Sequence, residues 1–180
     1  MLAPQITFNS GSSPYDQIGT INYIKTIEKT GVILPVKEGE QSDDILFRVY
    51  NNWALAAGIA NALNVSIGVY DNQNLDASNI AIVQNWVSVY ESGYGENSIQ
   101  PGTYTFYPGQ SGIINPLAIG ASNEYIILKG SDGSSAAVIN AGTNNNGLGF
   151  AEITSYVSVP TNANFQTINF AIVLSYEFVS

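Results

Sequence analysis

The chain has 180 residues, a formal net charge of −9 at pH 7 and a pI near 4.1, and it contains neither histidine nor cysteine. Catalysis near neutral pH draws mostly on histidine, on a thiolate or on a tuned lysine, so this composition argues against an enzyme and leaves no thiolate for a disulfide or a metal site. Five lysine and arginine residues are too few for a phosphate-binding stripe, so we expect neither nucleic acid nor an anionic membrane surface as a partner.

Charged residues make up 11% of the chain, against about 25% in ordinary soluble proteins. The polar surface must therefore consist of Asn, Ser, Thr, Gln and Gly. A surface of this kind loses few ion pairs when carboxylates protonate, so we expect an acid-tolerant protein. An ordinary surface protein that has drifted toward Asn and Ser is the alternative. The absence of cysteine fits a cytosolic chain, a virion or a thermophilic protein on a very hot exterior, where thiols are a liability.

Residues 1–180 predict a single domain. Its first residues, Met1–Gln5, have neither a basic region nor a long apolar stretch, so no signal peptide is expected, and no segment reaches the ~18 apolar residues of a membrane span. Alternation of apolar and polar residues, which is typical of β-strands, then dominates. The expected strands are Gln5–Phe8, Thr20–Ile27, Val32–Val36, Ile45–Tyr50, Leu63–Tyr70, Ile80–Val83, Asn85–Tyr90, Gly102–Tyr107, Tyr125–Lys129, Ala136–Asn140, Ile153–Val159 and Ile168–Phe178.

So many short strands, separated by Gly, Pro and Asn turns, predict an all-β protein: a single-domain antiparallel β-sandwich of jelly-roll or Ig-like topology. Trp53–Leu63 is ambiguous, because its alanines favour a helix whereas Gly58 and the strand that follows favour an extended segment. Val-Tyr pairs followed by two polar residues begin at positions 49, 69 and 89. This spacing predicts three successive hairpins, unless the repeat is due to chance.

We assign no catalytic residue. Gly109–Ile113 departs from the G-x-S-x-G motif at its last position, and the chain has no histidine to act as its base. Two carboxylates could hydrolyse a glycosidic bond. The candidates are Asp43, Asp44, Glu91, Glu96, Asp132 and Glu152. The first two read as a solvated turn, and Glu91 and Glu96 flank Gly93–Gly95, which reads as a hairpin tip.

Nor do we assign a metal or cofactor site. Calcium takes the oxygen ligands that Asp71–Asp76 offers, but this segment lacks the Gly and the distal Glu of an EF-hand loop, so an Asx turn is expected. The sequon Asn64–Ser66 lies within a predicted strand, where glycosylation is not expected. Outward tyrosines such as Tyr70 and Tyr107 could stack on a glycan, contact another subunit or simply cover the sheet.

The terminal strands are the expected sites of contact between subunits, because few charges guard the sheet edges. Residues 1–10 could form an exchanged N-terminal arm. If so, deletion of these residues should abolish polymers and leave a folded monomer.

Segments such as Leu63–Asp71 and Thr167–Phe178 make the chain resemble the jelly-roll structural proteins of virions, most of all those of viruses that infect thermoacidophilic archaea. The resemblance lies in composition and strand pattern along most of the chain, and no site residue follows from it. It implies a capsid, penton or turret subunit, located in the virion, whose partners are its own copies and other virion proteins. The alternatives are a subunit of an extracellular filament or surface layer joined by strand exchange, and a carbohydrate-binding β-sandwich module.

Overall fold

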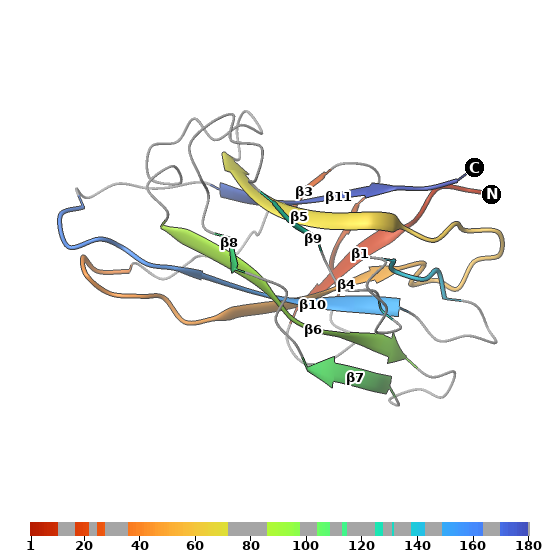
Figure 1. The fold of residues 1–180 in the computed structure, drawn as a ribbon, viewed down its shortest axis with the longest axis horizontal. Helices are drawn as coiled ribbons and strands as arrows, with labels where there is room; N and C mark the ends of the chain where they lie inside the picture. The colour runs from red at the N-terminus through yellow and green to blue at the C-terminus, as the bar shows by residue number, and fades with distance from the viewer. Residues whose placement is uncertain are drawn as a thin grey trace.

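The computed structural model describes residues 1–10, 17–21, 25–27, 36–71, 86–97, 104–108, 113–114, 125–127, 131, 138–142, 149–163 and 170–179. Every regular element in these ranges is a β-strand, and the strands form two sheets. The two sheets face each other as layers (Figure 1). The predicted all-β sandwich is therefore confirmed. Within the described ranges, no helix is long and apolar enough to cross a membrane.

Seven strands form the larger sheet. Their order is β2 (Gln17–Ile21), β1 (Ile6–Ser10), β4 (Ile45–Asn51), β10 (Gly149–Val157), β6 (Val87–Asn97) and β7 (Tyr104–Pro108), with β8 (Ile113–Ile114) also paired to β6. The smaller sheet has the order β3 (Lys25–Ile27), β11 (Phe170–Glu177), β5 (Leu63–Asp71) and β9 (Tyr125–Ile127). All of these pairings are antiparallel.

The chain crosses repeatedly between the two layers. Only the steps from β1 to β2, from β6 to β7 and from β7 to β8 stay within one sheet; every other step between described strands leads to the opposite sheet. The three-hairpin interpretation of the Val-Tyr repeat is therefore wrong, because β4 and β6 belong to the larger sheet and β5 to the smaller. The predicted strand Thr20–Ile27 likewise divides into β2 and β3, which lie in different sheets.

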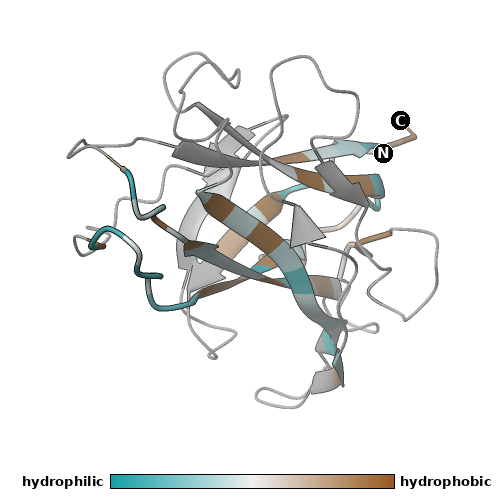
Figure 2. Ribbon diagram, turned by 60° about the vertical axis from the view of Figure 1, so that its left-hand side comes forward, coloured by the Kyte–Doolittle hydropathy of each residue, from teal (hydrophilic) through white to brown (hydrophobic). Residues whose placement is uncertain are grey.

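The core fills the space between the layers. On β5, Val65 and Ile67 are buried and Asn64 is exposed, and on β11 Leu174 is buried and Glu177 exposed, as the alternation predicted. Figure 2 shows the same alternation of apolar and polar residues along the strands. Each fully buried aliphatic side chain contributes about 1.5–3 kcal/mol. The core cluster comprises Ile6, Phe8, Phe47, Val49, Ala62, Val65, Ile67, Trp86, Val87, Val89, Ile139, Ala151, Ile153, Val157 and Leu174.

Residues 53–62 are not helical. They form turns joined to the rest of the molecule by two isolated bridges, Leu2 to Ile59 and Ala62 to Ile139. Leu55 has a φ of 54° and Gly58 a φ of 79°, and a right-handed helix cannot include such residues. Of the two readings of Trp53–Leu63, the helix is therefore wrong. Of the predicted strand Ala136–Asn140, residues 138–140 are described and contain a bridge at Ile139; 136–137, 32–35 and 80–83 lie outside the described residues.

A buried asparagine, Asn51, ties three separate segments together. Its Oδ1 accepts a hydrogen bond from the backbone N–H of Gln5 at 3.0 Å, and its Nδ2 donates to the carbonyls of Ala60 at 2.9 Å and Ile139 at 3.1 Å. The side chain is fully buried, and its bonds to Gln5 and Ile139 join segments 46 and 88 residues apart. The amide thus supplies a partner to the Gln5 N–H and the Ala60 carbonyl, and a second donor to the Ile139 carbonyl, which also accepts from the N–H of Ala62.

Its neighbour Asn52 organises the loop that follows. Asn52 has a φ of 60°, a conformation that asparagine tolerates better than most residues. Its side chain accepts a hydrogen bond from the N–H of Ala56 at 2.8 Å and donates to the carbonyl of Ala56 and to that of Gly142. Two adjacent asparagines therefore fix the course of residues 53–62 without regular secondary structure.

Both terminal strands are interior strands. β1 lies between β2 and β4, and β11 lies between β3 and β5. Ile6 and Phe8 of β1 have no exposed surface. Deletion of residues 1–10 would remove a strand that has a neighbour on each side, which argues against a folded monomer after the deletion; the outcome stays a prediction. Exchange of this arm between copies stays a prediction, and the edges of the described sheets are instead β2, β7, β8, β3 and β9.

Candidate functional site

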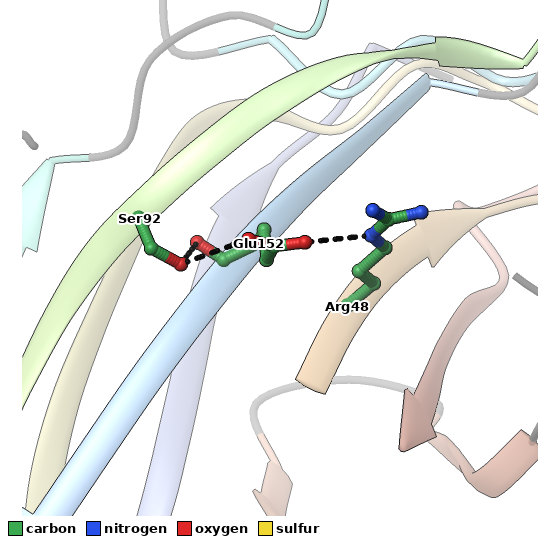
Figure 3. Close-up of polar contacts among 3 residues, drawn as sticks. All are labelled: Arg48, Ser92 and Glu152. Carbon is green, nitrogen blue, oxygen red and sulfur yellow. Dashed lines mark hydrogen bonds and ion pairs between the residues drawn. The ribbon is translucent and has the colours of Figure 1, made fainter. Parts of the chain in front are cut away.

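An ion pair is buried in the middle of the larger sheet. Arg48 of β4 and Glu152 of β10 are directly opposite in the strand register. The Nε of Arg48 donates to Oε2 of Glu152 at 2.9 Å, and the two side chains are 4% and 9% exposed. From the next strand, the Oγ of Ser92 in β6 donates to Oε1 of Glu152 at 3.2 Å (Figure 3). Three adjacent strands thus contribute to one polar network.

Aromatic rings surround the guanidinium of Arg48. Its carbon Cζ lies 4.7 Å from the ring centroid of Phe150 and 5.8 Å from that of Phe106. The two rings are nearly parallel, with centroids 6.4 Å apart. A cation–π contact out of water stabilises by up to about 2 kcal/mol. The edge strand β7, which holds Phe106, is thereby attached to the centre of the sheet.

Glycine in β6 makes room for this ring. A Cβ added to Gly93 would collide with the ring of Phe106. Gly93 and Gly95 pair with Pro108 and Phe106 of β7 in an unbroken strand. The prediction of a hairpin tip at Gly93–Gly95 is therefore wrong. The glycines allow close approach of a side chain and do not form a turn.

The predicted carboxylates are dispersed. Glu91 is fully buried in β6, Glu152 is held by Arg48, and Asp43 and Asp44 are exposed in the chain before β4. Asp132 and residues 72–76 lie outside the described residues. Among the residues described, no three His, Cys, Asp or Glu side chains are grouped as a metal site. The Arg48–Glu152 pair therefore has a structural role, in which it packs the sheet and holds β4 and β10 in register.

A second group of polar and aromatic side chains lies at the β7 end of the sheet. Tyr94 and Tyr107 are opposite one another in the register, with ring centroids 5.5 Å apart and planes 24° apart. Glu96 shares the face of Tyr94, because side chains two residues apart in a strand point the same way. Its Oε1 accepts a hydrogen bond from Nδ2 of Asn140 at 2.7 Å. We call Tyr94, Glu96, Tyr107 and Asn140 the tyrosine shelf.

Tyr107 is 41% exposed, as expected for a surface tyrosine. The register places it on the face of Tyr94 and Ala151, which carries the core farther along the sheet, so the expectation that it is directed outward is wrong. The side chain of Tyr70 lies outside the described residues. The sequon residue Asn64 is the second residue of β5, at an irregularity where φ is 50°. It is exposed, and its Nδ2 donates to Oε2 of Glu177 at 2.8 Å.

The buried network was missed in the sequence because its members are 104 residues apart. One signal was present in the sequence: Arg48 is the charged residue of Ile45–Tyr50, a predicted strand that is otherwise apolar. If such an arginine is buried, an anionic group must lie close to it to neutralise its charge. The tyrosine shelf could not be assembled without the β6–β7 register.

No model of a protein family matches the chain, and the comparisons with curated proteins and with solved structures found no significant match. The function is therefore inferred from the residues themselves.

Proposed function

We propose that this protein is a structural subunit of a virus particle, as a capsid, penton or turret component, and that it acts by self-assembly. The role is non-enzymatic, and its partners are further copies of the chain and other virion proteins. The observation that supports the proposal best is the edge strand β7.

β7 reads Tyr-Thr-Phe-Tyr-Pro, without a charged residue. Among the described strands it is the last of its sheet along the main order, and it lies apart from the smaller sheet (Figure 1). Phe106 is 36% exposed and Tyr107 is 41% exposed. Natural edge strands are usually protected by charges, bulges or covering segments. An uncharged aromatic edge favours pairing with another strand, and aromatic residues are enriched at interfaces.

The partner strand that fits this edge best is β7 of a second copy. An antiparallel pair can be related by a two-fold axis, so one strand is complementary to itself. The chain carries a net charge of −9, and two copies repel each other at most surfaces. Pairing through β7 brings no like charges face to face. A five-residue contact is small beside the ~1,600 Å² of a standard interface, so several contacts must act together in an assembly.

Two alternatives remain as proposals of lower rank. A filament or surface-layer subunit on a cell exterior would use the same edge but extend in one direction. A carbohydrate-binding module would bind its glycan without any need to assemble. The form of the assembled state distinguishes a closed shell or ring from a fibre, and both from a monomer.

Light scattering with negative-stain microscopy tests the proposal. We expect ordered assemblies at high protein concentration, most readily near pH 4, where the net charge is close to zero. Phe106→Lys should give monomers at every concentration, because lysine opposes edge pairing. The matched control is Leu55→Lys, since Leu55 is also 36% exposed but lies in a loop.

Both substitutions make the net charge less negative by one, so a general effect of charge would act equally on both. Loss of assembly in Phe106→Lys alone, with an unchanged circular dichroism spectrum, supports the proposal. A wild-type chain that stays monomeric at pH 4 and pH 7 contradicts it. Equal assembly of the two variants contradicts the role of β7.

A further inference from the structure

We infer that the tyrosine shelf binds a neutral hexose oligosaccharide. This inference is independent of self-assembly, because it concerns the face of β6 and β7 and not the free edge of β7.

The shelf has an exposed aromatic surface that is fixed in orientation. The Tyr107 ring is stacked against Tyr94, which is half-buried and supports it from the neighbouring strand. Because Tyr107 is 41% exposed, part of its ring is accessible to a ligand. Tyrosine offers a rigid apolar surface with a polar hydroxyl at its end. Such a surface matches a pyranose ring, which has C–H groups on its faces and hydroxyl groups around its rim.

Polar groups stand beside the rings and are held in place by a chain of hydrogen bonds. Asn140 donates to Glu96, Asn61 donates to Oδ1 of Asn140 at 3.2 Å, and the N–H of Ala141 donates to Oδ1 of Asn61 at 2.8 Å. Asn61 is exposed, and Glu96 and Asn140 are half-buried. Planar amides and carboxylates that are already oriented bind hydroxyl groups with little loss of entropy.

The neighbouring backbone explains why these groups keep their positions. Gly149 of β10 is opposite Glu96 in the register. A Cβ on Gly149 would meet the backbone nitrogen of Asn140 and the side chain of Ser131, so glycine allows this segment to lie against the sheet. The N–H of Asn140 also donates to Oγ of Ser131 at 3.3 Å. The polar part of the shelf therefore rests on rigid elements, as precise binding requires.

The negative charge of the shelf and of the whole chain should favour neutral sugars over anionic ones. Glu96 is the ionisable carboxylate of the shelf, and the whole chain is strongly acidic. Arg48, the single arginine of the chain, is held in the buried pair with Glu152. An anionic saccharide would meet repulsion from Glu96 without a compensating cation in the shelf. We therefore expect neutral hexose chains to bind and uronic acid chains not to bind.

The test is isothermal titration of the full chain with cellotetraose, maltotetraose, mannotetraose, galactotetraose and chitotetraose, and with tetragalacturonate as the anionic probe. Saturation-transfer NMR on the same samples gives a second readout. We expect at least one neutral sugar to bind at millimolar concentration and tetragalacturonate not to bind.

Tyr107→Ala should weaken binding about tenfold or more, which is the loss of one aromatic contact. The matched control is Phe106→Ala, since Phe106 is the adjacent exposed aromatic residue on the opposite face of the same strand. Its affinity should stay within about twofold of the wild type. Glu96→Gln should allow tetragalacturonate to bind, a change of specificity that loss of packing alone would not produce.

Three results would each overturn the inference: no neutral sugar binds, Phe106→Ala weakens binding as much as Tyr107→Ala, or tetragalacturonate binds the wild type best. The monomeric variant Phe106→Lys should retain sugar binding. Failure of the assembly experiment and failure of this one are therefore distinguishable.

Discussion

The centre and the β7 end of the larger sheet use similar residues for different purposes. At the centre, both faces of β4 and β10 are almost entirely buried, and Arg48 pairs with Glu152 and lies over the ring of Phe150. At the end, aromatic and polar side chains of β6 and β7 remain accessible. Side chains of the same kinds thus stabilise the fold at the buried centre of the sheet and form an accessible contact surface at its β7 end.

The largest effect should come from breaking the central ion pair. Glu152→Ala leaves the Arg48 guanidinium buried without its carboxylate, which costs about 3–5 kcal/mol of unfolding free energy. Urea denaturation followed by circular dichroism measures the loss. The double variant Arg48→Met/Glu152→Leu should recover most of it, because an apolar pair of similar size is often neutral. A loss below about 1 kcal/mol for Glu152→Ala would contradict a structural role for the pair.

Asn51→Ala should be the next most harmful change. It removes the side-chain partner of the Gln5 N–H and of the Ala60 carbonyl, and one of the two donors to the Ile139 carbonyl, and it should cost about 2–3 kcal/mol. Chemical denaturation again provides the measurement. Asn162→Ala is the matched control, because Asn162 is exposed, and its effect should stay within about 0.5 kcal/mol. Equal effects of the two replacements would rule out the proposed role of Asn51.

Gly93→Ala tests the link between the centre and the end. The added methyl group collides with the ring of Phe106, so we expect a loss of about 1–3 kcal/mol in unfolding free energy. In the background of Phe106→Ala the same change should be nearly neutral. A double-mutant cycle of thermal or urea unfolding measures this coupling. Additive effects would mean that the ring does not lie against Gly93.

Ser155→Ala should have the smallest effect, and in the opposite direction. Its Oγ is buried and has no hydrogen-bond partner in the part of the chain that the structure describes. Removing this hydroxyl should stabilise the fold by about 1 kcal/mol. A rise in the urea midpoint at constant slope would agree with this, and a fall would indicate a bond to an ordered water.

Alternation alone was sufficient to predict β5 and β11, since one face of each contacts the core. It failed for the first half of β10, Gly149–Glu152, because both faces are buried there and the period-2 signal is lost. It also failed at Gly93–Gly95, where glycine accommodates a ring and local turn rules do not apply. The Arg48–Glu152 pair and the tyrosine shelf depend on register between distant strands, which no local pattern contains.

The resemblance to virion proteins remains a proposal. The proposal of a virion role is supported by the residues of β7. The residues of the interior strands explain the fold and do not support any particular function.

The most direct measurement is hydrogen–deuterium exchange of the wild-type chain in dilute and in concentrated solution near pH 4. If β7 is the contact between copies, the backbone amides of Tyr104–Tyr107 should exchange more slowly in the concentrated sample, while those of β4 and β10 remain unchanged. Unchanged exchange in β7, or protection confined to another strand, would contradict the account.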